Sequence, residues 1–341
     1  MDDEKAFDLV MAYSPAIPNW SQMPGGDKQE GMVAQFAPGL PGLKRHRGSL
    51  YVDNTDAAFQ DEMLRFYETY LHAASLSTGL DDALFSLSQE TARGFFAFVE
   101  RLDRLAEAPR AVKGQITGPF TLGTVIKDPS GVAIFHDEIL RDMIVKLLAM
   151  KARWQVEQLA AKGFPVILFI DEPALAGFGT SEFISISREV ILDCLAELIG
   201  MIHRAGGLAG IHVCANTDWS MLMETGADMI SFDAYTYFDR LILYQDAIVD
   251  FMNAGKYLAW GIVPTVRTDD IEKETISSLT KQFKHKTENL FALGIDPSIV
   301  LRQSLITPSC GTGALTSRHT EKVLRLTKGI SDNMRREERY A

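Results

Sequence analysis

Three residues with soft metal-binding side chains stand out in this sequence. His212 and Cys214 lie two positions apart at the end of an apolar run, and Cys310 follows Thr-Pro-Ser far downstream. Residues i and i+2 of a strand point to the same face, so the first imidazole and thiol converge. A third ligand from a distant segment leaves one coordination position open, which is typical of catalytic zinc. The pattern predicts a Zn²⁺ site.

The context of each cysteine separates this prediction from the alternative that cysteine is simply buried as a small hydrophobic residue. Cys194 lies at helical spacing from Ile191, Leu195 and Leu198, which indicates that it belongs to the apolar face of a helix. Cys214 and Cys310 instead precede polar and turn residues, Ala-Asn-Thr-Asp after one and Gly-Thr-Gly after the other. Functional side chains concentrate in such loops, so we assign only these two to the site.

Short apolar runs, each closing on a polar, proline or glycine signal, alternate with longer amphipathic stretches along the chain. The expected strands are 112–117, 165–170, 208–213, 229–232, 257–262 and 299–306, and the expected helices are 137–162, 181–205 and 271–293. This alternation predicts an α/β fold with a parallel sheet, and polar residues at successive strand ends favour a (β/α)8 TIM barrel. A doubly wound open sheet is the alternative, but no glycine-rich phosphate motif follows an early strand.

Length and composition indicate how the chain is organised. With 341 residues and 46% hydrophobic content, it can form one large domain. We expect a single catalytic barrel over residues 1–341, with an irregular segment over 1–50 and a charged terminal helix over 328–341. The formal net charge of -11 is spread along the chain, which disfavours nucleic acid and anionic membranes as partners. The chain has few cysteines, no signal peptide and no membrane-length apolar run, which together predict a cytoplasmic protein.

Polar residues at the ends of two expected strands are candidates for substrate binding. Asp171 and Glu172 are adjacent, so only one of them faces the barrel axis, and we expect Asp171 to bind a substrate ammonium group. The alternative is an acid that interacts with a helix N-terminus. Gln115 and Thr117 precede a Gly-Pro pair, where a tight turn brings the backbone close to a ligand.

Four motifs taken together resemble the cobalamin-independent methionine synthase family. They are Lys113–Thr121 (KGQITGPFT), Ile170–Leu175 (IDEPAL), His212–Cys214 (HVC) and Pro308–Gly311 (PSCG), in the order and spacing of that family. The similarity spans roughly residues 17–313. It corresponds to the family's carboxyl-terminal catalytic barrel, which is related to uroporphyrinogen decarboxylase and to zinc corrinoid methyltransferases.

The resemblance implies roles for particular residues. It makes His212, Cys214 and Cys310 zinc ligands, and it places Asp233 where the family has a glutamate as fourth ligand, one methylene longer. A thiol bound to zinc is deprotonated at neutral pH, which suits methyl transfer to sulfur.

The resemblance also implies a substrate site. Asp171 is expected to contact the amino group of homocysteine, and Glu30, in Gln-Glu-Gly-Met, is expected as a second contact. Gln115 and Thr117 complete the expected set. An acceptor carrying a sulfonate would require a basic residue instead, which Lys113 or Arg267 can supply.

Three departures from the family fall on its folate side. The chain has no room for the additional amino-terminal barrel, and the Gly-Ser-x-Pro motif is missing, so an atypical or truncated first strand is expected. The strand 257–262 leads to Asp269 and Asp270 rather than to the family's histidine. A methylated corrinoid, free or protein-bound, is therefore the expected donor, because its cobalt leaving group needs no proton.

These observations predict a zinc-dependent methyltransferase acting on a thiol, with homocysteine as the expected acceptor and methionine as the product. Two alternatives stay open. A lyase like uroporphyrinogen decarboxylase would need several arginines for substrate carboxylates, of which Arg45 and Arg47 are a thin counterpart. A subunit that binds zinc or a corrinoid without catalysis would carry the same three ligands.

Overall fold

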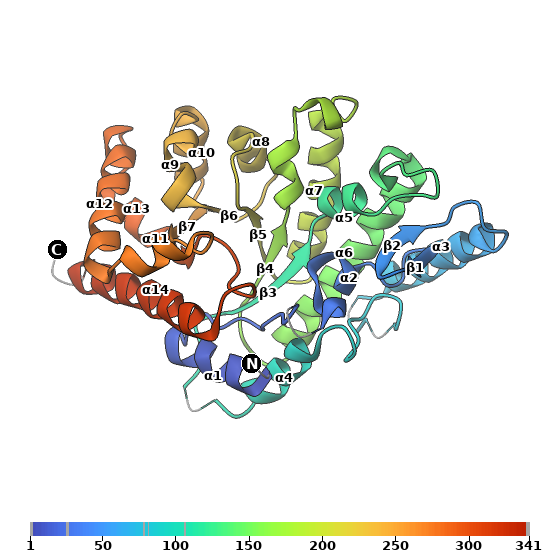
Figure 1. Ribbon diagram of the computed structural model, residues 1–341, viewed down its shortest axis with the longest axis horizontal. Helices are drawn as coiled ribbons and strands as arrows, with labels where there is room; N and C mark the ends of the chain where they lie inside the picture. Colours follow the sequence, from blue (N-terminus) through green and yellow to red (C-terminus); the bar gives the residue numbers. More distant parts are fainter. Residues whose placement is uncertain (1–2, 25–26, 78, 81, 106, 339–341) are drawn as a thin grey trace. The chain divides into compact units, whose positions relative to one another are not determined.

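The computed structural model describes residues 3–24, 27–77, 79–80, 82–105 and 107–338, drawn with labelled elements in Figure 1. The chain divides into two compact units. One unit comprises residues 1–18 and 210–341, and the other comprises residues 19–209.

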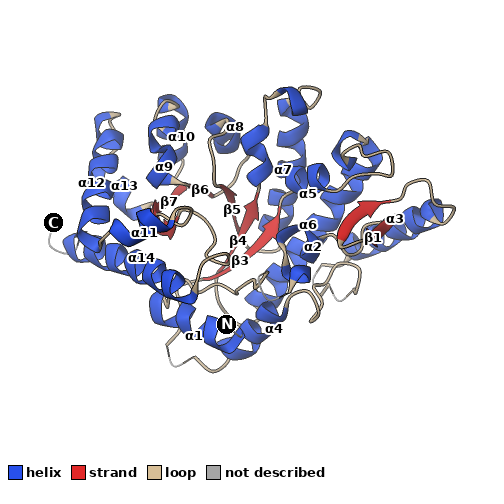
Figure 2. Ribbon diagram, viewed as in Figure 1, coloured by secondary structure: helices blue, strands red, loops and turns tan. Residues whose placement is uncertain are grey.

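The unit of residues 19–209 combines an antiparallel hairpin with parallel strands and long helices (Figure 2). Its elements are η1 (Lys28–Glu30), α2 (Met32–Phe36), β1 (Leu43–His46), β2 (Ser49–Val52), α3 (Phe59–Ser75), α4 (Arg93–Leu102), β3 (Val112–Thr117), α5 (Pro119–Val125), η2 (Ile134–His136), α6 (Glu138–Ala160), β4 (Val166–Asp171), η3 (Pro173–Gly177), η4 (Ser181–Phe183) and α7 (Arg188–Arg204). The first fifty residues, expected to be irregular, thus contain regular elements.

The unit of residues 1–18 and 210–341 carries the remaining strands, with β5 beginning two residues before its boundary. Its elements are α1 (Asp3–Tyr13), β5 (Leu208–Val213), α8 (Trp219–Glu224), β6 (Met229–Phe232), α9 (Ala234–Leu241), α10 (Gln245–Asn253), β7 (Tyr257–Val263), α11 (Thr268–Lys273), α12 (Ile276–Ala292), α13 (Pro297–Arg302), β8 (Ser304–Pro308) and α14 (Ser317–Glu338). The expected terminal helix is the end of α14, and residues 339–341 lie outside the described residues.

The parallel strands are arranged in the order β3-β4-β5-β6-β7-β8, and helices connect successive strands. The pairs β3–β4, β5–β6, β6–β7 and β7–β8 are parallel, with Val112 opposite Val166 in the first and Trp260 opposite Ile306 in the last. An α/β fold with a parallel sheet is therefore confirmed. Six consecutive strands in sequential order are consistent with part of a (β/α) barrel, whereas a closed eight-stranded barrel stays a proposal.

The segment before β3 lies beside that strand without forming a regular strand of its own. Asn19 forms an isolated parallel bridge with Lys113, and the Gln115 side-chain amide donates to Trp20 O at 3.3 Å. This stretch therefore runs beside β3 as a single bridge rather than as a regular strand. It belongs to the unit of residues 19–209.

Aromatic side chains fix β6 and β7, which lie between the strands that carry the metal-binding residues. The Trp260 ring stacks on Phe238 with centroids 5.7 Å apart and meets Phe283 edge-on at 5.2 Å. Phe232 and Trp219 extend the cluster, and every residue of β6 is buried. Aromatic packing of this kind supplies much of a core's stability, so the strand ends that follow rest on a rigid base.

Three expected elements were wrong in part, and the errors have local causes. The helix expected over 181–205 begins only at Arg188, because Ser187 is its N-cap and accepts from Val190 N at 3.4 Å, while Ser181–Phe183 form the separate turn η4. The run 299–306 was expected to be one strand, but Asp296 caps a helix by accepting from Ser298 N at 2.7 Å, and Pro297 occupies its first turn. Helix α13 therefore takes the first part of that run and β8 the second. The helix expected over 271–293 is interrupted where Thr275 and Ser278 form a capping box that starts α12.

Among the described residues, no helix combines the length and the apolar character needed to cross a membrane.

Candidate metal centre

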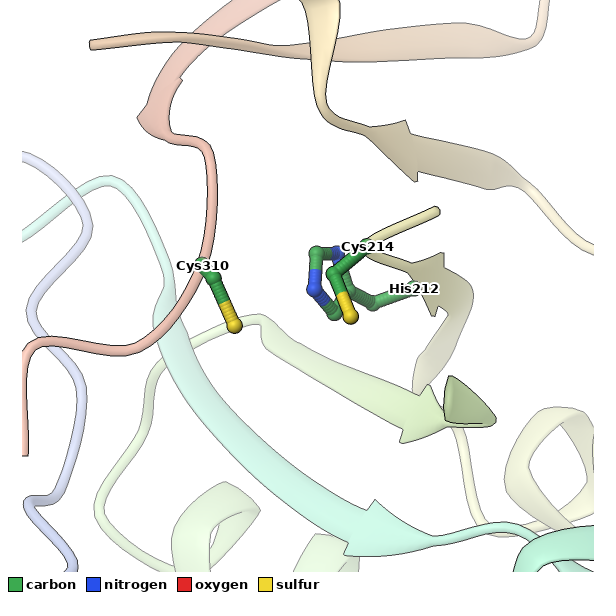
Figure 3. A group of neighbouring side chains, drawn as sticks. All are labelled: His212, Cys214 and Cys310. Atoms are coloured by element: carbon green, nitrogen blue, oxygen red, sulfur yellow. The ribbon is translucent and has the colours of Figure 1, made fainter. Parts of the chain in front are cut away.

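The three residues predicted to bind zinc come together in one unit. Ligand atoms of His212, Cys214 and Cys310 all lie within 4.8 Å of one another. Figure 3 shows the His212 and Cys214 side chains side by side at the end of β5, with the Cys310 sulfur directed toward them from the chain after β8. All three are partly exposed, so a ligand can reach the cluster. The sequence prediction that these residues converge is confirmed, although their binding of an ion is a separate proposal.

The position of Cys310 is set by the residue before it. Ser309 N donates to Val263 O at 2.8 Å, which continues the pairing of β8 with β7 by one residue. The Ser309 hydroxyl also accepts from Thr265 N at 3.2 Å and lies 3.0 Å from Thr265 Oγ1. These hydrogen bonds hold the backbone directly before Cys310 in place.

Gly261 is the residue of β7 that permits this close pairing. A Cβ atom at Gly261 would lie 2.6 Å from Phe232 O and 2.7 Å from Ser309 Cα. The register between β7 and β8 also shifts between Gly261 and Val263. The backbone that leads to Cys310 thus passes where only a glycine leaves room for it.

His212 is oriented by a hydrogen bond from a neighbouring strand. Its Nδ1 lies 2.9 Å from Ser231 Oγ, and the two residues are paired directly across β5 and β6. Since Nδ1 is engaged, Nε2 is the nitrogen left for a metal ion. Ligand histidines in proteins are commonly oriented through their second nitrogen in this way.

The cluster favours a thiolate. Hydrogen bonding with the Cys214 thiol, and then with the His212 imidazole, lowers the pKa of the Cys310 thiol to about 4 despite its burial. Cys194 provides the contrast, because it is buried in α7 and that burial raises the pKa of its thiol to about 12. A metal ion binds the thiolate form, so Cys310 has the required chemistry, and the prediction that Cys194 belongs to the core is confirmed.

Asp233, predicted as a fourth ligand, is not among the three clustered residues. It is buried directly after β6, and its Oδ1 accepts from Thr236 N at 2.9 Å as the N-cap of α9. Burial raises the pKa of its carboxyl group, against hydrogen bonds from the α9 backbone, and the nearby charge of Cys310 adds to this rise. The structure thus gives Asp233 a capping role near the cluster, and ligation stays a prediction.

The predicted substrate residues of β3 and β4 share one face of these strands. Thr117 is paired directly with Asp171, and Gln115 lies two positions earlier on the same face of β3. The Thr117 hydroxyl donates to Met32 O at 2.7 Å, and the Gln115 amide donates to Trp20 O. Both side chains therefore hold the chain segment that precedes β3, whereas Asp171 is half-buried at the end of its strand.

Glu172, the other member of the acidic pair, lies at the start of helix α5. It points to the opposite side from Asp171, is fully buried, and accepts from Phe120 N at 2.9 Å and Thr121 N at 2.7 Å. The Thr121 hydroxyl donates to it at 2.6 Å. Burial raises the pKa of the Glu172 carboxyl to about 7, against these hydrogen bonds. The helix-terminal role weighed for this acidic pair thus falls to Glu172, and the Gly-Pro start of α5 was its signal.

The predicted amino-group contact Glu30 is already engaged within its own unit. Its Oε1 accepts from Arg93 Nε at 2.8 Å, and its Oε2 accepts from Met23 N at 2.9 Å. The residue is 1% exposed. These contacts explain the burial of Glu30 without a substrate, and substrate binding by it stays a prediction.

The two basic residues considered for a sulfonate acceptor lie in different settings. The Lys113 ammonium group lies 4.9 Å from the centre of the Phe169 ring, on the same strand face as Gln115. Arg267 is exposed, and its Nε lies 3.7 Å from Asp270 Oδ2. Of the two, only Lys113 is fixed by a strand.

Comparison with known proteins adds no family assignment: no protein-family model matches this chain, and no curated protein matches it.

Proposed function

We propose that the protein is a zinc-dependent methyltransferase that methylates a thiol, with homocysteine as the acceptor and a methylated corrinoid as the donor. The observation that carries this proposal is the convergence of His212, Cys214 and Cys310 within 4.8 Å. The resemblance to the cobalamin-independent methionine synthase family supports the same reading. Within this proposal the whole chain corresponds to that family's catalytic (β/α)8 barrel.

The donor set fits zinc. Zinc binds cysteine sulfur at about 2.3 Å and histidine nitrogen at about 2.0–2.1 Å, so tetrahedral ligand atoms lie roughly 3.5 Å apart. The three atoms here are at most 4.8 Å apart, and small side-chain rotations of the partly exposed cysteines close the difference. Two sulfurs and one nitrogen are soft ligands that select zinc over magnesium or calcium.

Three protein ligands leave a fourth position for a substrate thiol. Zinc, when bound, would hold that thiol as a thiolate at neutral pH. His212, kept in place by Ser231, and the thiolate-favouring Cys310 are the residues that prepare this position. We propose Asp171 as the carboxylate that recognises the acceptor's ammonium group.

The proposed donor follows from the balance of the transfer. The acceptor sulfur forms a new S–C bond while the Co–C bond breaks and its electron pair stays on cobalt, so the leaving group takes no proton. Transfer from a folate would require a proton at the departing nitrogen. The loop after β7, residues 264–270, contains no histidine to supply it.

Metal analysis of three proteins tests the site. The purified wild type should hold about one zinc per chain, and Cys310→Ala should lose most of it because one of three ligands is gone. Cys194→Ala is the matched control, since this cysteine lies in the core of α7 and should leave the zinc content unchanged. Equal zinc in all three proteins would refute the proposed site.

A transfer assay tests the reaction. Homocysteine is supplied with either methylcobalamin or methyltetrahydrofolate, and methionine is measured. We expect methionine from methylcobalamin only, and its loss in Cys310→Ala. Efficient turnover with the folate would overturn the proposed donor, and zinc binding without any thiol methylation would favour a non-catalytic binding subunit.

A further inference from the structure

Lys151 is a buried lysine outside the metal centre. Lys151 lies within α6, and the residue is 1% exposed. Its Nζ donates to Ser86 O at 3.0 Å, and within the described part of the chain no carboxylate forms an ion pair with it. Burial accordingly lowers the pKa of this ammonium group to about 8. A buried charge is costly unless it is paired, so the position calls for an explanation.

A cavity of about 320 Å³ adjoins the Lys151 side chain. Its wall lies within the unit of residues 19–209. Polar groups in the wall come from Gln35, Ser86, Ser88 and Thr91, and Leu84 contributes apolar surface. Ser88 is exposed, so the cavity is open on that side. Cavities of about 300–1,000 Å³ are the size that small-molecule sites in proteins have.

The polar part of the wall is held in place by its own hydrogen bonds. The Gln35 amide donates to Thr91 O and accepts from the Gln22 amide. Thr91 N donates to Ser88 Oγ at 3.3 Å, and the two hydroxyl oxygens lie 3.1 Å apart. Hydroxyl protons rotate, so at least one of this pair can be directed at an acceptor in the cavity.

We propose that this cavity is a binding site for a small monocarboxylate, with Lys151 as its counter-ion and the hydroxyls of Ser88 and Thr91 as further donors. Among the described residues that line the cavity, Lys151 carries the one positive charge. One carboxylate neutralises that charge, whereas a phosphate dianion would leave an uncompensated negative charge in a poorly solvated place. The apolar part of the wall, at Leu84, covers the hydrocarbon body of the acid.

The competing explanation is that Lys151 only anchors the Ser86 carbonyl. That role needs no ligand and predicts that carboxylates do not bind. Binding measurements therefore distinguish the two explanations. They are independent of the metal centre, because Lys151 and the cavity wall belong to the other unit.

Calorimetric titration of the full chain with butyrate is the test. We expect saturable binding of butyrate, with butyramide and inorganic sulfate binding at least about tenfold more weakly, because butyramide carries no charge and sulfate is a dianion. Lys151→Met should weaken butyrate binding by about tenfold to a hundredfold. Lys146→Met is the matched control: it lies on the same helix but pairs with Asp142 and lines no part of the cavity.

A second variant keeps the test decisive if Lys151→Met fails to fold. Ser88→Phe changes an exposed residue at the opening, retains the lysine, and should block butyrate by filling the entrance. Absence of butyrate binding to the wild type, or equal binding to the wild type and both cavity variants, would overturn the proposal. Tighter binding of sulfate than of butyrate would overturn the assignment of a monocarboxylate.

Discussion

Replacing Gly261 by alanine should damage the fold and the metal centre together. The added Cβ would meet Phe232 O at 2.6 Å and Ser309 Cα at 2.7 Å, whereas ordinary contacts of a Cβ atom begin near 3.4 Å. Both obstacles belong to the backbones of neighbouring strands, which cannot rotate away as a side chain would. The strands must separate by several tenths of an ångström, and the chain that leads to Cys310 moves with them.

The size of the effect follows from these overlaps. Overpacking a buried position costs about 1–3 kcal/mol, and backbone obstacles on both sides place this substitution near the upper end. A loss of about 3 kcal/mol lowers the melting temperature by roughly 6–12 °C for a unit of this size. Metal ligands tolerate displacements of only about 0.2 Å, so zinc affinity should fall by at least about tenfold.

Thermal unfolding with and without zinc, together with a competition titration against a chelator, measures both effects. Gly311→Ala is the matched control, because Gly311 directly follows Cys310 but a Cβ there meets no atom within 4 Å. It should melt and bind zinc as the wild type does. A Gly261→Ala protein with wild-type melting temperature and zinc affinity would refute the reasoning from close strand approach.

Three further predictions concern single side chains. Ser231→Ala removes the partner of His212 Nδ1 and should weaken zinc binding by about tenfold without lowering the melting temperature by more than a few degrees, as chelator competition and thermal unfolding would show. Asp233→Ala should lower the free energy of unfolding by about 1 kcal/mol because it removes the N-cap of α9, whereas Asp233→Asn should keep the cap and the stability. A large loss of zinc in Asp233→Asn would instead identify Asp233 as a metal ligand. The pKa of the Glu172 carboxyl is raised from 4.5 to about 7 in the folded protein, so this carboxyl binds its proton more tightly in the folded state than in the unfolded state. The free energy of unfolding should therefore fall by about 3 kcal/mol as the pH rises from 4.5 to 7. Urea titrations across that pH range should show this decline in the wild type and not in Glu172→Gln.

The metal-binding cluster could be predicted from sequence because it depends on short-range rules. The alternation of side chains along a strand is enough to place His212 and Cys214 on one face, and the end of an apolar run is enough to locate Cys310 near a strand terminus. The hydrogen bond from Ser231 could not be predicted. It depends on the register between β5 and β6, which no local pattern specifies.

The acidic pair after β4 shows the same limit. The alternation of side chains along a strand correctly predicted that Asp171 and Glu172 point to opposite sides, but it did not predict which groups each carboxyl contacts. The amides of α5 that bind Glu172 come from a segment about fifty residues earlier in the chain. Likewise, the partner of Glu30 is Arg93, which belongs to a distant helix. Contacts of this kind arise from packing, and a single sequence carries little information about them.

The convergence of the metal-binding residues also constrains the sheet that carries them. In the strand order, β6 and β7 lie between β5 and β8, and neighbouring strands are about 4.8 Å apart, so a flat sheet would separate β5 from β8 by about 14 Å. Yet ligand atoms from the ends of these two strands lie within 4.8 Å. Ser309 still pairs with β7, so the single residue Cys310 cannot span such a gap. The strands of this unit must therefore curve toward one another at their carboxyl ends, which is the curvature that a (β/α) barrel requires.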